Sequence, residues 1–140
     1  MVEETARAGG RAAGRGNRRS RGSREPAEIT IPQEVADEIV RAVGRERGRE
    51  MAARMERATR AYARDRYSEA LRITHRLVEL VPESVAVREL HGLACYRMGR
   101  WREAARHLEA ARSSGGDSNQ VPVIMDCRRA LGQNRKVEAL

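Results

Sequence analysis

The chain repeats itself at an interval of 34 residues. At that shift the segment Tyr67–Ala70 falls on Trp101–Ala104, so that Tyr-Ser-Glu-Ala is aligned with Trp-Arg-Glu-Ala. Four neighbouring positions agree as well: Ala58 with Gly92, Tyr62 with Tyr96, Asp65 with Gly99, and Leu71 with Ala105. A third copy appears at a shift of 35, which aligns Lys136–Ala139 with the same motif, Cys127 with Gly92, Leu131 with Tyr96, and Asn134 with Gly99. A period of this length predicts a stack of similar supersecondary units, each burying its apolar face against its neighbours.

Apolar residues recur with helical spacing from about residue 32 onward, and short runs rich in Gly, Pro, Asn and Asp interrupt them. These breaks predict helices over 32–43, 49–64, 67–80, 84–98, 101–112 and 121–132, with a further helix starting near 135. No segment has the alternating β-branched pattern of a strand. The sequence therefore predicts an all-α protein.

Residues 51–140 resemble tetratricopeptide repeats (TPR), a family built from 34-residue helix–turn–helix units. The second copy matches best, with small, turn, aromatic and large residues at the family's positions: Gly92, Gly99, Trp101, Ala104, Leu108 and Ala111. The first copy keeps a shorter set: Ala58, Tyr67, Ala70 and Pro82. A small residue at 58 or 92 permits two helices to approach closely, and Gly99 suits a turn with positive φ.

The resemblance implies a right-handed superhelical TPR solenoid of antiparallel helix pairs with about 2.5 repeats. The repeats span about 51–84, 85–119 and a truncated 120–140, within a TPR domain over 49–140. The third repeat stops at Leu140 without a capping signal, and a bare solenoid edge is poorly soluble. We therefore expect the chain to be the N-terminal part of a longer bacterial TPR protein.

The resemblance also implies a non-enzymatic scaffold, whose concave surface receives a peptide or helix of a partner protein. Carried onto this chain, that partner-binding groove consists of Met55, Thr59, Tyr62, Glu89, Leu93, Tyr96, Ile124, Arg128 and Leu131. Its mixture of apolar and charged groups favours an amphipathic or extended peptide over a small metabolite. We expect no cofactor and no metal ion.

A capping or linker segment over 28–48 precedes the repeats. Its helix begins near Pro32, which suits a first helical turn, and it carries an apolar stripe of Val35, Ile39 and Val43 that requires a partner surface. The polar run 44–50 is either a hinge or the solvated middle of a longer helix. Arg54 and Arg57 stand where the family usually places apolar residues, so we expect the first repeat to lack a full neighbour on that side.

Residues 1–27 form a basic tail with little to bury, and we expect it to be disordered. Of the formal charge of +8, residues 1–24 carry +5, from seven Arg and two Glu. Arg interleaved with Gly and Ser resembles segments that bind RNA or DNA without sequence preference. The arginines concerned are Arg11, Arg15, Arg18, Arg19, Arg21 and Arg24. Weak nucleic-acid binding by this tail is the alternative function, and a solubilising extension is the simpler interpretation.

The cysteines, the histidines and one row of arginines could each form a functional site, but a structural role is the simpler interpretation of all three. Cys95 and Cys127 are interpreted as buried small hydrophobes, and His75, His91 and His107 as ordinary surface or half-buried residues. An arginine stripe consists of Arg54, Arg57, Arg60 and Arg64. We interpret it as a solvated helix face with the pairs Glu50–Arg54 and Glu56–Arg60.

Composition excludes further classes. No apolar run reaches the length of about 18 residues that a membrane span requires, and two cysteines make no disulfide framework. The tail lacks the apolar region of a secretory signal, so we expect a cytoplasmic protein. Of the 28 basic residues all but Lys136 are Arg, which fits a GC-rich coding bias.

Overall fold

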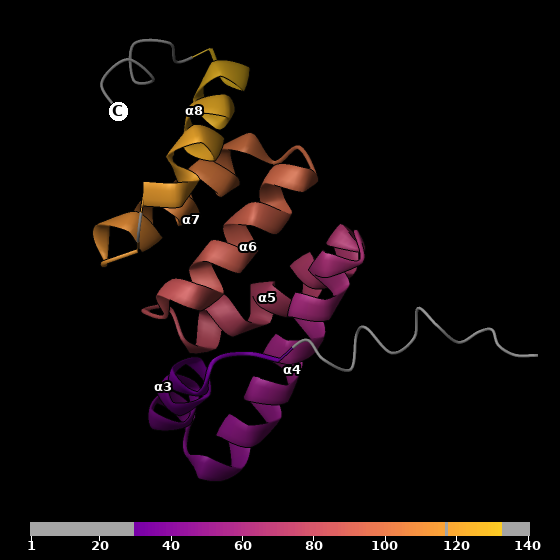
Figure 1. The fold of residues 1–140 in the computed structure, drawn as a ribbon, viewed down its shortest axis with the longest axis vertical. Coiled ribbons are helices and arrows are strands. Elements are labelled where there is room, and N and C mark those ends of the chain that lie inside the picture. Colours follow the sequence, from indigo (N-terminus) through magenta and orange to yellow (C-terminus); the bar gives the residue numbers. More distant parts are fainter. Residues whose placement is uncertain (1–29, 117, 133–140) are drawn as a thin grey trace, which may run out of the picture. The chain divides into compact units, whose positions relative to one another are not determined.

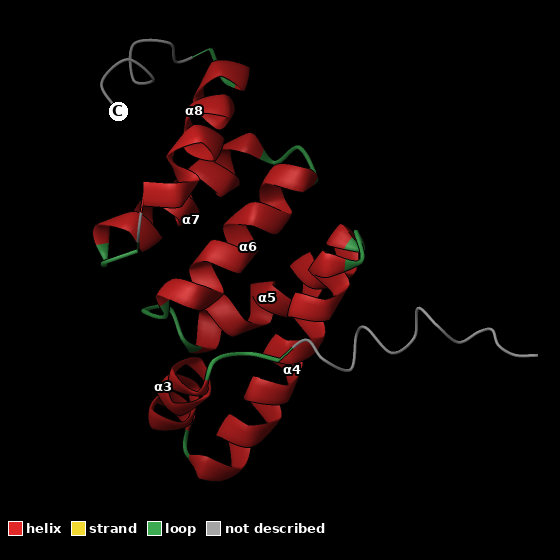
Figure 2. Cartoon of the chain, viewed as in Figure 1, coloured by secondary structure: helices red, strands yellow, loops and turns green. Residues whose placement is uncertain are grey.

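The computed structural model of the chain describes residues 30–116 and 118–132. Within these ranges every regular element is a helix, which confirms the all-α prediction (Figures 1 and 2). The elements are α3 (Gln33–Val43), α4 (Arg45–Ala63), α5 (Tyr67–Leu80), α6 (Val85–Arg97), α7 (Trp101–Ser113), the 3-10 turn η3 (Ser118–Gln120) and α8 (Val121–Ala130). The predicted tail, 1–27, and the helix predicted from 135 lie outside the described residues.

The helix ends lie within two residues of the predicted ones, except at the start of α4. Gly44 has a φ of 94°, a conformation that favours glycine, and the helix resumes directly at Arg45. The run 44–50, predicted as either a hinge or part of a longer helix, therefore has features of both. Gly44 breaks the helix for one residue, and 45–50 form the first turns of α4. Ser84 caps α6 by accepting a hydrogen bond from the Val87 amide at 3.2 Å.

Each helix packs mainly against its neighbours in sequence, and the described helices all belong to one packing unit, Ile31–Leu140. The α3 helix docks on α4 through Ile39, which is fully buried in a cluster with Met51 and Met55. A Cβ atom at Gly48 would lie 2.6 Å from the Val40 Cα, so only glycine permits this approach of the two helices. Within the predicted segment 28–48, α3 thus covers the first half of α4 (Figure 1).

A second core cluster is built mostly from small side chains of α4 to α8: Ala61, Ala70, Leu71, Ala94, Cys95, Ala104, Ala105 and Cys127. The α6 and α7 helices also approach closely at Gly92, where a Cβ atom would lie 2.7 Å from the Leu108 Cγ. Tyr62, Tyr96 and Trp101 pack partly buried against this cluster. The buried small residues and the partly buried aromatic residues of this cluster include positions that recur in the 34-residue repeat, such as Ala70 with Ala104 and Tyr62 with Tyr96.

Three helix ends share one turn geometry. Asp65, Gly99 and Gly132 have φ values of 64°, 77° and 76°, and each lies two residues beyond the end of α4, α6 or α8. Their amides donate to the carbonyls of Tyr62, Tyr96 and Arg129 at 3.0, 3.1 and 3.0 Å. The first two turns are 34 residues apart, as predicted.

The third turn corrects the sequence alignment. The sequence repeat aligns Asn134 with Gly99 at a shift of 35, whereas the positive-φ residue equivalent to Gly99 is Gly132, at a shift of 33. A glycine two residues from an asparagine offers two competing turn positions. Gly132 has the turn conformation two residues beyond α8, and Asn134 lies outside the described residues. The equivalent of Tyr96 is consequently Arg129 and not Leu131.

Candidate functional site

Three of the predicted groove residues lie in the interior. Met55 is 4% exposed, Ile124 is fully buried, and Arg128 is 8% exposed, where its guanidinium pairs with the Glu109 carboxylate of α7. Met55 belongs to the cluster beneath α3. Their burial removes all three from a surface that a partner can reach.

The other six predicted residues are half-buried: Thr59, Tyr62, Glu89, Leu93, Tyr96 and Leu131. Thr59 donates its hydroxyl to the Met55 carbonyl at 2.9 Å, which satisfies it within α4. Leu131 is the C-cap of α8 and lies beyond the last residue of that helix, whereas Tyr96, its predicted equivalent, lies within α6. The corrected register replaces the three third-repeat residues by Pro122, Asp126 and Arg129, which the sequence alignment missed. The available signal was Gly132, the one glycine in that turn.

One face of α6 carries three of these six half-buried residues: Glu89, Leu93 and Tyr96. Val85, Ala86, Glu89, Leu93 and Tyr96 follow helical spacing along this face, and all are half-buried. Leu93 packs in neither core cluster, unlike Leu90 beside it. We call this set the α6 face. It presents a continuous row of partly exposed apolar and acidic groups.

A pocket of about 360 Å³ begins this row, between α3 and α6. Its walls are Glu34, Val35, Glu38 and Arg41 of α3, with Val85, Ala86 and Glu89 of α6. Three carboxylates and one guanidinium surround an apolar floor. The pocket therefore suits an apolar group with a cation beside it.

At the other end of the α6 face, Tyr96 connects two repeats. Its hydroxyl donates to the Asp126 carboxylate at 2.9 Å, and Arg129 donates to the same carboxylate at 2.7 Å. The hydrogen bonds from Arg129 and then Tyr96 lower the pKa of Asp126, while the bond to Asp126 raises the pKa of Tyr96. The Tyr96 ring meets Trp101 edge-on, with centroids 5.7 Å apart. The end of the row is thus held in a defined orientation.

The edge-on aromatic pair recurs one repeat earlier. Tyr62 meets Tyr67 edge-on at 5.2 Å, and Tyr67 donates its hydroxyl to Asp65 at 2.7 Å. Arg97 of the next repeat lies over the Tyr67 ring, 5.2 Å from its centroid. A hydrogen bond to Tyr62 raises the pKa of Arg97. Each aromatic pair therefore lies within one repeat, whereas the Arg97–Tyr67 contact and the Tyr96–Asp126 hydrogen bond join successive repeats.

The three histidines form a row across α5, α6 and α7, which the sequence analysis did not foresee. His91 is 3% and His107 is 7% exposed, whereas His75 is exposed. The His91 ring lies 6.1 Å from His75 and 4.6 Å from His107, centroid to centroid. Histidines spaced sixteen residues apart in the sequence thus meet, because the connecting turns return each helix to its neighbour.

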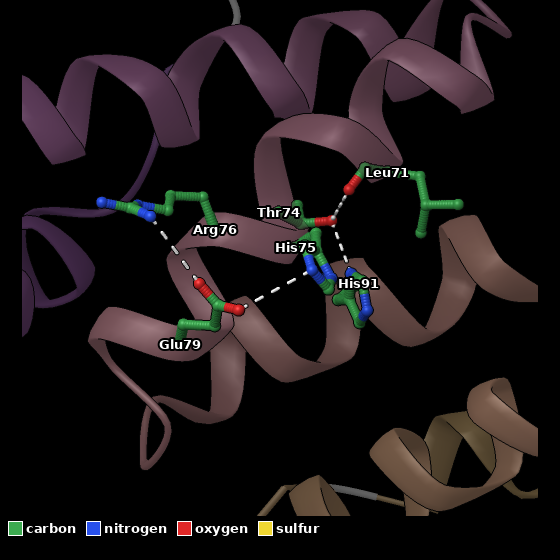
Figure 3. Close-up of polar contacts among 6 residues, drawn as sticks. All are labelled: Leu71, Thr74, His75, Arg76, Glu79 and His91. Carbon is green, nitrogen blue, oxygen red and sulfur yellow. Dashed lines mark hydrogen bonds and ion pairs between the residues drawn. The ribbon is translucent and has the colours of Figure 1, made fainter.

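Hydrogen bonds indicate which ring nitrogens of the buried His91 and His107 carry a proton. Thr74 donates to the Leu71 carbonyl at 3.3 Å, so its oxygen accepts from His91 Nδ1 at 2.8 Å (Figure 3). A guanidinium only donates, so His107 Nδ1 accepts from Arg88 at 3.1 Å. Burial, reinforced by neighbouring cations, lowers the pKa of His91 and of His107 to about 4. Both are neutral at pH 7 and act as satisfied core residues.

The exposed His75 has a different environment. Glu79 lies 3.7 Å from the His75 ring and 3.9 Å from Arg76 on the same helix (Figure 3). An open pocket of about 390 Å³ adjoins the row, with Leu71, His75, His91 and Met98 among its lining residues. Met98, at 43%, is the large apolar side chain most exposed among the described residues.

The cysteines are buried, as expected. Burial raises the pKa of the Cys95 thiol to about 12 and that of Cys127 to about 11, so both are protonated and unreactive at neutral pH. In the described ranges no three His, Cys, Asp or Glu side chains are placed to hold a metal ion. None of the helices in those ranges combines the length and apolar content needed to cross a bilayer.

The arginines predicted to contact nucleic acid all lie outside the described residues: Arg11, Arg15, Arg18, Arg19, Arg21 and Arg24.

Comparison with known proteins gives no match for this chain among protein-family models, curated proteins or solved structures.

Proposed function

We propose that the chain is a TPR-type scaffold that binds a peptide or helix of a partner protein along the concave side of antiparallel helix pairs. The observation that carries the proposal is the α6 face. Leu93 sits half-exposed at its centre and packs in neither core cluster, although a large apolar residue gains about 1.5–3 kcal/mol from burial. A partner side chain placed there would complete that burial.

The chemistry of the α6 face narrows the partner. One end is the pocket beside α3, where Glu34, Glu38 and Glu89 surround apolar groups. The other end presents Tyr96 with Asp126 and Arg129. We therefore propose an amphipathic peptide with an apolar residue at Leu93 and a basic residue near Glu89. Aromatic and apolar anchors at the centre with charges at the rim are common in peptide grooves.

A selection from a displayed peptide library on the full-length chain tests this function. Selected peptides should carry Arg or Lys next to an apolar anchor, and Leu93→Ala should weaken their binding about tenfold, as expected for a central anchor. Met98→Ala, which truncates an exposed apolar residue on the other pocket, is the matched control and should leave Kd unchanged. Equal weakening by both variants, or none by Leu93→Ala, would count against this groove.

The double variant Leu93→Ala with Tyr96→Ala should abolish capture. Because Tyr96 also packs on the core and bonds to Asp126, this variant needs a helicity measurement beside the binding measurement. Tyr96→Phe removes the hydroxyl alone and separates the two roles.

The second candidate is RNA binding through the tail, favoured by seven arginines against two glutamates in residues 1–24. If every one of these arginines met a phosphate, log K would fall against log salt with a slope of roughly −5 to −6. Deleting 1–24 should then abolish salt-sensitive RNA retention. Absence of retention by the intact chain at low salt would end this candidate.

A further inference from the structure

Four arginines gather around one pocket at the end of α4. Arg57, Arg60 and Arg64 follow helical spacing on one face of this helix, and Arg66 joins them from the turn into α5. The buried Ala61 and the half-buried Glu69 complete the lining of about 190 Å³. We call this the arginine pocket.

Positive charge in the arginine pocket is largely uncompensated. Glu69 is its single acid and lies 3.8 Å from Arg66, so four positive charges and one negative leave +3. The predicted pair Glu50–Arg54 forms at 3.1 Å one turn earlier, whereas the predicted pair Glu56–Arg60 does not. Among the described residues, Arg57, Arg60 and Arg64 have no acidic partner. Like charges so close together repel, and an anion between them would relieve that repulsion.

The pocket lies where the covering helix ends. The α3 helix packs on the first half of α4, through contacts such as Val40 with Gly48 and Ile39 with Met51 and Met55. Arg57, farther along α4, and Arg64, directly after its last residue, are exposed. A terminal repeat needs a polar outer face for solubility, and scattered single charges satisfy that need. Four arginines that line one small concavity go beyond that need.

We propose that the arginine pocket binds a di- or triphosphate group. Guanidinium groups form paired hydrogen bonds with phosphate oxygens in a geometry that a compact anion can satisfy several times at once. A single nucleic-acid strand spreads its charge along its length, one per nucleotide. Linked phosphates instead concentrate several charges in a small volume, which matches the +3 of the pocket.

Titration of the full-length chain with inorganic tripolyphosphate at low ionic strength, followed by calorimetry, tests the proposal. One molecule should bind per chain, and Arg60→Gln with Arg64→Gln should weaken binding at least tenfold. Arg60 is half-buried and Arg64 is exposed, and neither belongs to a core cluster, so helicity by circular dichroism should stay unchanged. No binding by the intact chain, or a Kd unchanged in this variant, would overturn the proposal.

Two matched controls remove the same charge elsewhere. Arg102→Gln with Arg112→Gln changes exposed arginines of α7, and Arg18→Gln with Arg19→Gln changes the tail. Each should alter Kd less than twofold. Weakening equal to that of the pocket variant would mean that net charge alone attracts the anion, and would overturn the site.

Further titrations distinguish the sources of the phosphate. Equal affinity for tripolyphosphate and adenosine triphosphate would mean that the phosphates alone are recognised, and tighter nucleotide binding would add contacts to the nucleoside. Either result supports the site if Arg60 and Arg64 are required. An oligonucleotide without terminal phosphates that binds more tightly than tripolyphosphate, through the same two arginines, would replace this proposal with a strand-binding surface.

Discussion

At Gly92 the absence of a methyl group allows α6 to approach α7. A Cβ atom there would lie 2.7 Å from Leu108 Cγ, and Leu108 is 1% exposed. The sequence analysis names both positions, because the second copy has a small residue at 92 and a large one at 108. Their direct contact is a physical reason for that combination.

Leu108→Ala should lower the free energy of unfolding by about 2–5 kcal/mol, through lost burial and the cavity left behind. Gly92→Ala should also destabilise, by about 1–3 kcal/mol, because the added methyl meets Leu108. The double variant should be less destabilised than the sum, since the alanine methyl enters the space that leucine vacates. Urea unfolding of the four proteins measures this coupling, and strict additivity would mean that the two residues do not touch.

The histidines mark where residue-scale prediction failed. A sequence spacing of sixteen carries no helical meaning, so only the packing of three helices revealed that His91 lies between His75 and His107. Burial of a neutral imidazole has a consequence for acid stability. Between pH 4 and the unfolded-state pKa of about 6.5, the folded state binds fewer protons than the unfolded chain.

The free energy of unfolding should therefore be fully present above about pH 6.5 and should fall as the pH drops toward 4, by a few kcal/mol in all. His91→Gln removes one titrating group and should flatten this decline, measured by urea unfolding at a series of pH values. His75→Gln, at the exposed end of the row, should leave the slope as it is. A slope unchanged in His91→Gln would contradict the role assigned to its burial.

At the scale of elements, helix ends were predictable where a glycine or proline marked them. The register of the third repeat was not predictable. Gly132 and Asn134 both suit a turn, and choosing Asn134 displaced the groove residues of α8 by two positions. Two of the residues so chosen, Ile124 and Arg128, proved to be buried, and Asp126 and Arg129 were missed. An error of two residues rotates a helix position by about 200°, which exchanges the inside for the outside.

The docking of α3 on α4 gives an element-scale prediction. Ile39→Ala should cost about 2–5 kcal/mol, because this fully buried side chain anchors α3 on Met51 and Met55. Hydrogen exchange should lose protection first in α3, with α6 and α7 less affected. Arg41→Ala, at an exposed position of the same helix, should leave both measurements unchanged. Uniform loss of protection in every helix would mean that α3 is inseparable from the repeats.

For the whole molecule, the charge of +8 has two parts with different meanings. The tail carries most of it, and its sequence alone gives a reason to consider nucleic acids. The remaining charge is not spread evenly over the helical part, because Arg57, Arg60, Arg64 and Arg66 line one pocket while the α6 face begins at three carboxylates. Periodicity predicted the helices that carry these groups. Their grouping depends on turn geometry and on where α3 ends, which periodicity does not encode.

Binding of a partner peptide along the α6 face can be measured by amide chemical-shift mapping of the full-length chain, titrated with a selected peptide. We expect the largest shift changes at Glu89, Leu93 and Tyr96, with smaller changes in α3 and at Asp126. Changes confined to the surroundings of Met98 and His75, with the α6 face unperturbed, would contradict binding along this face.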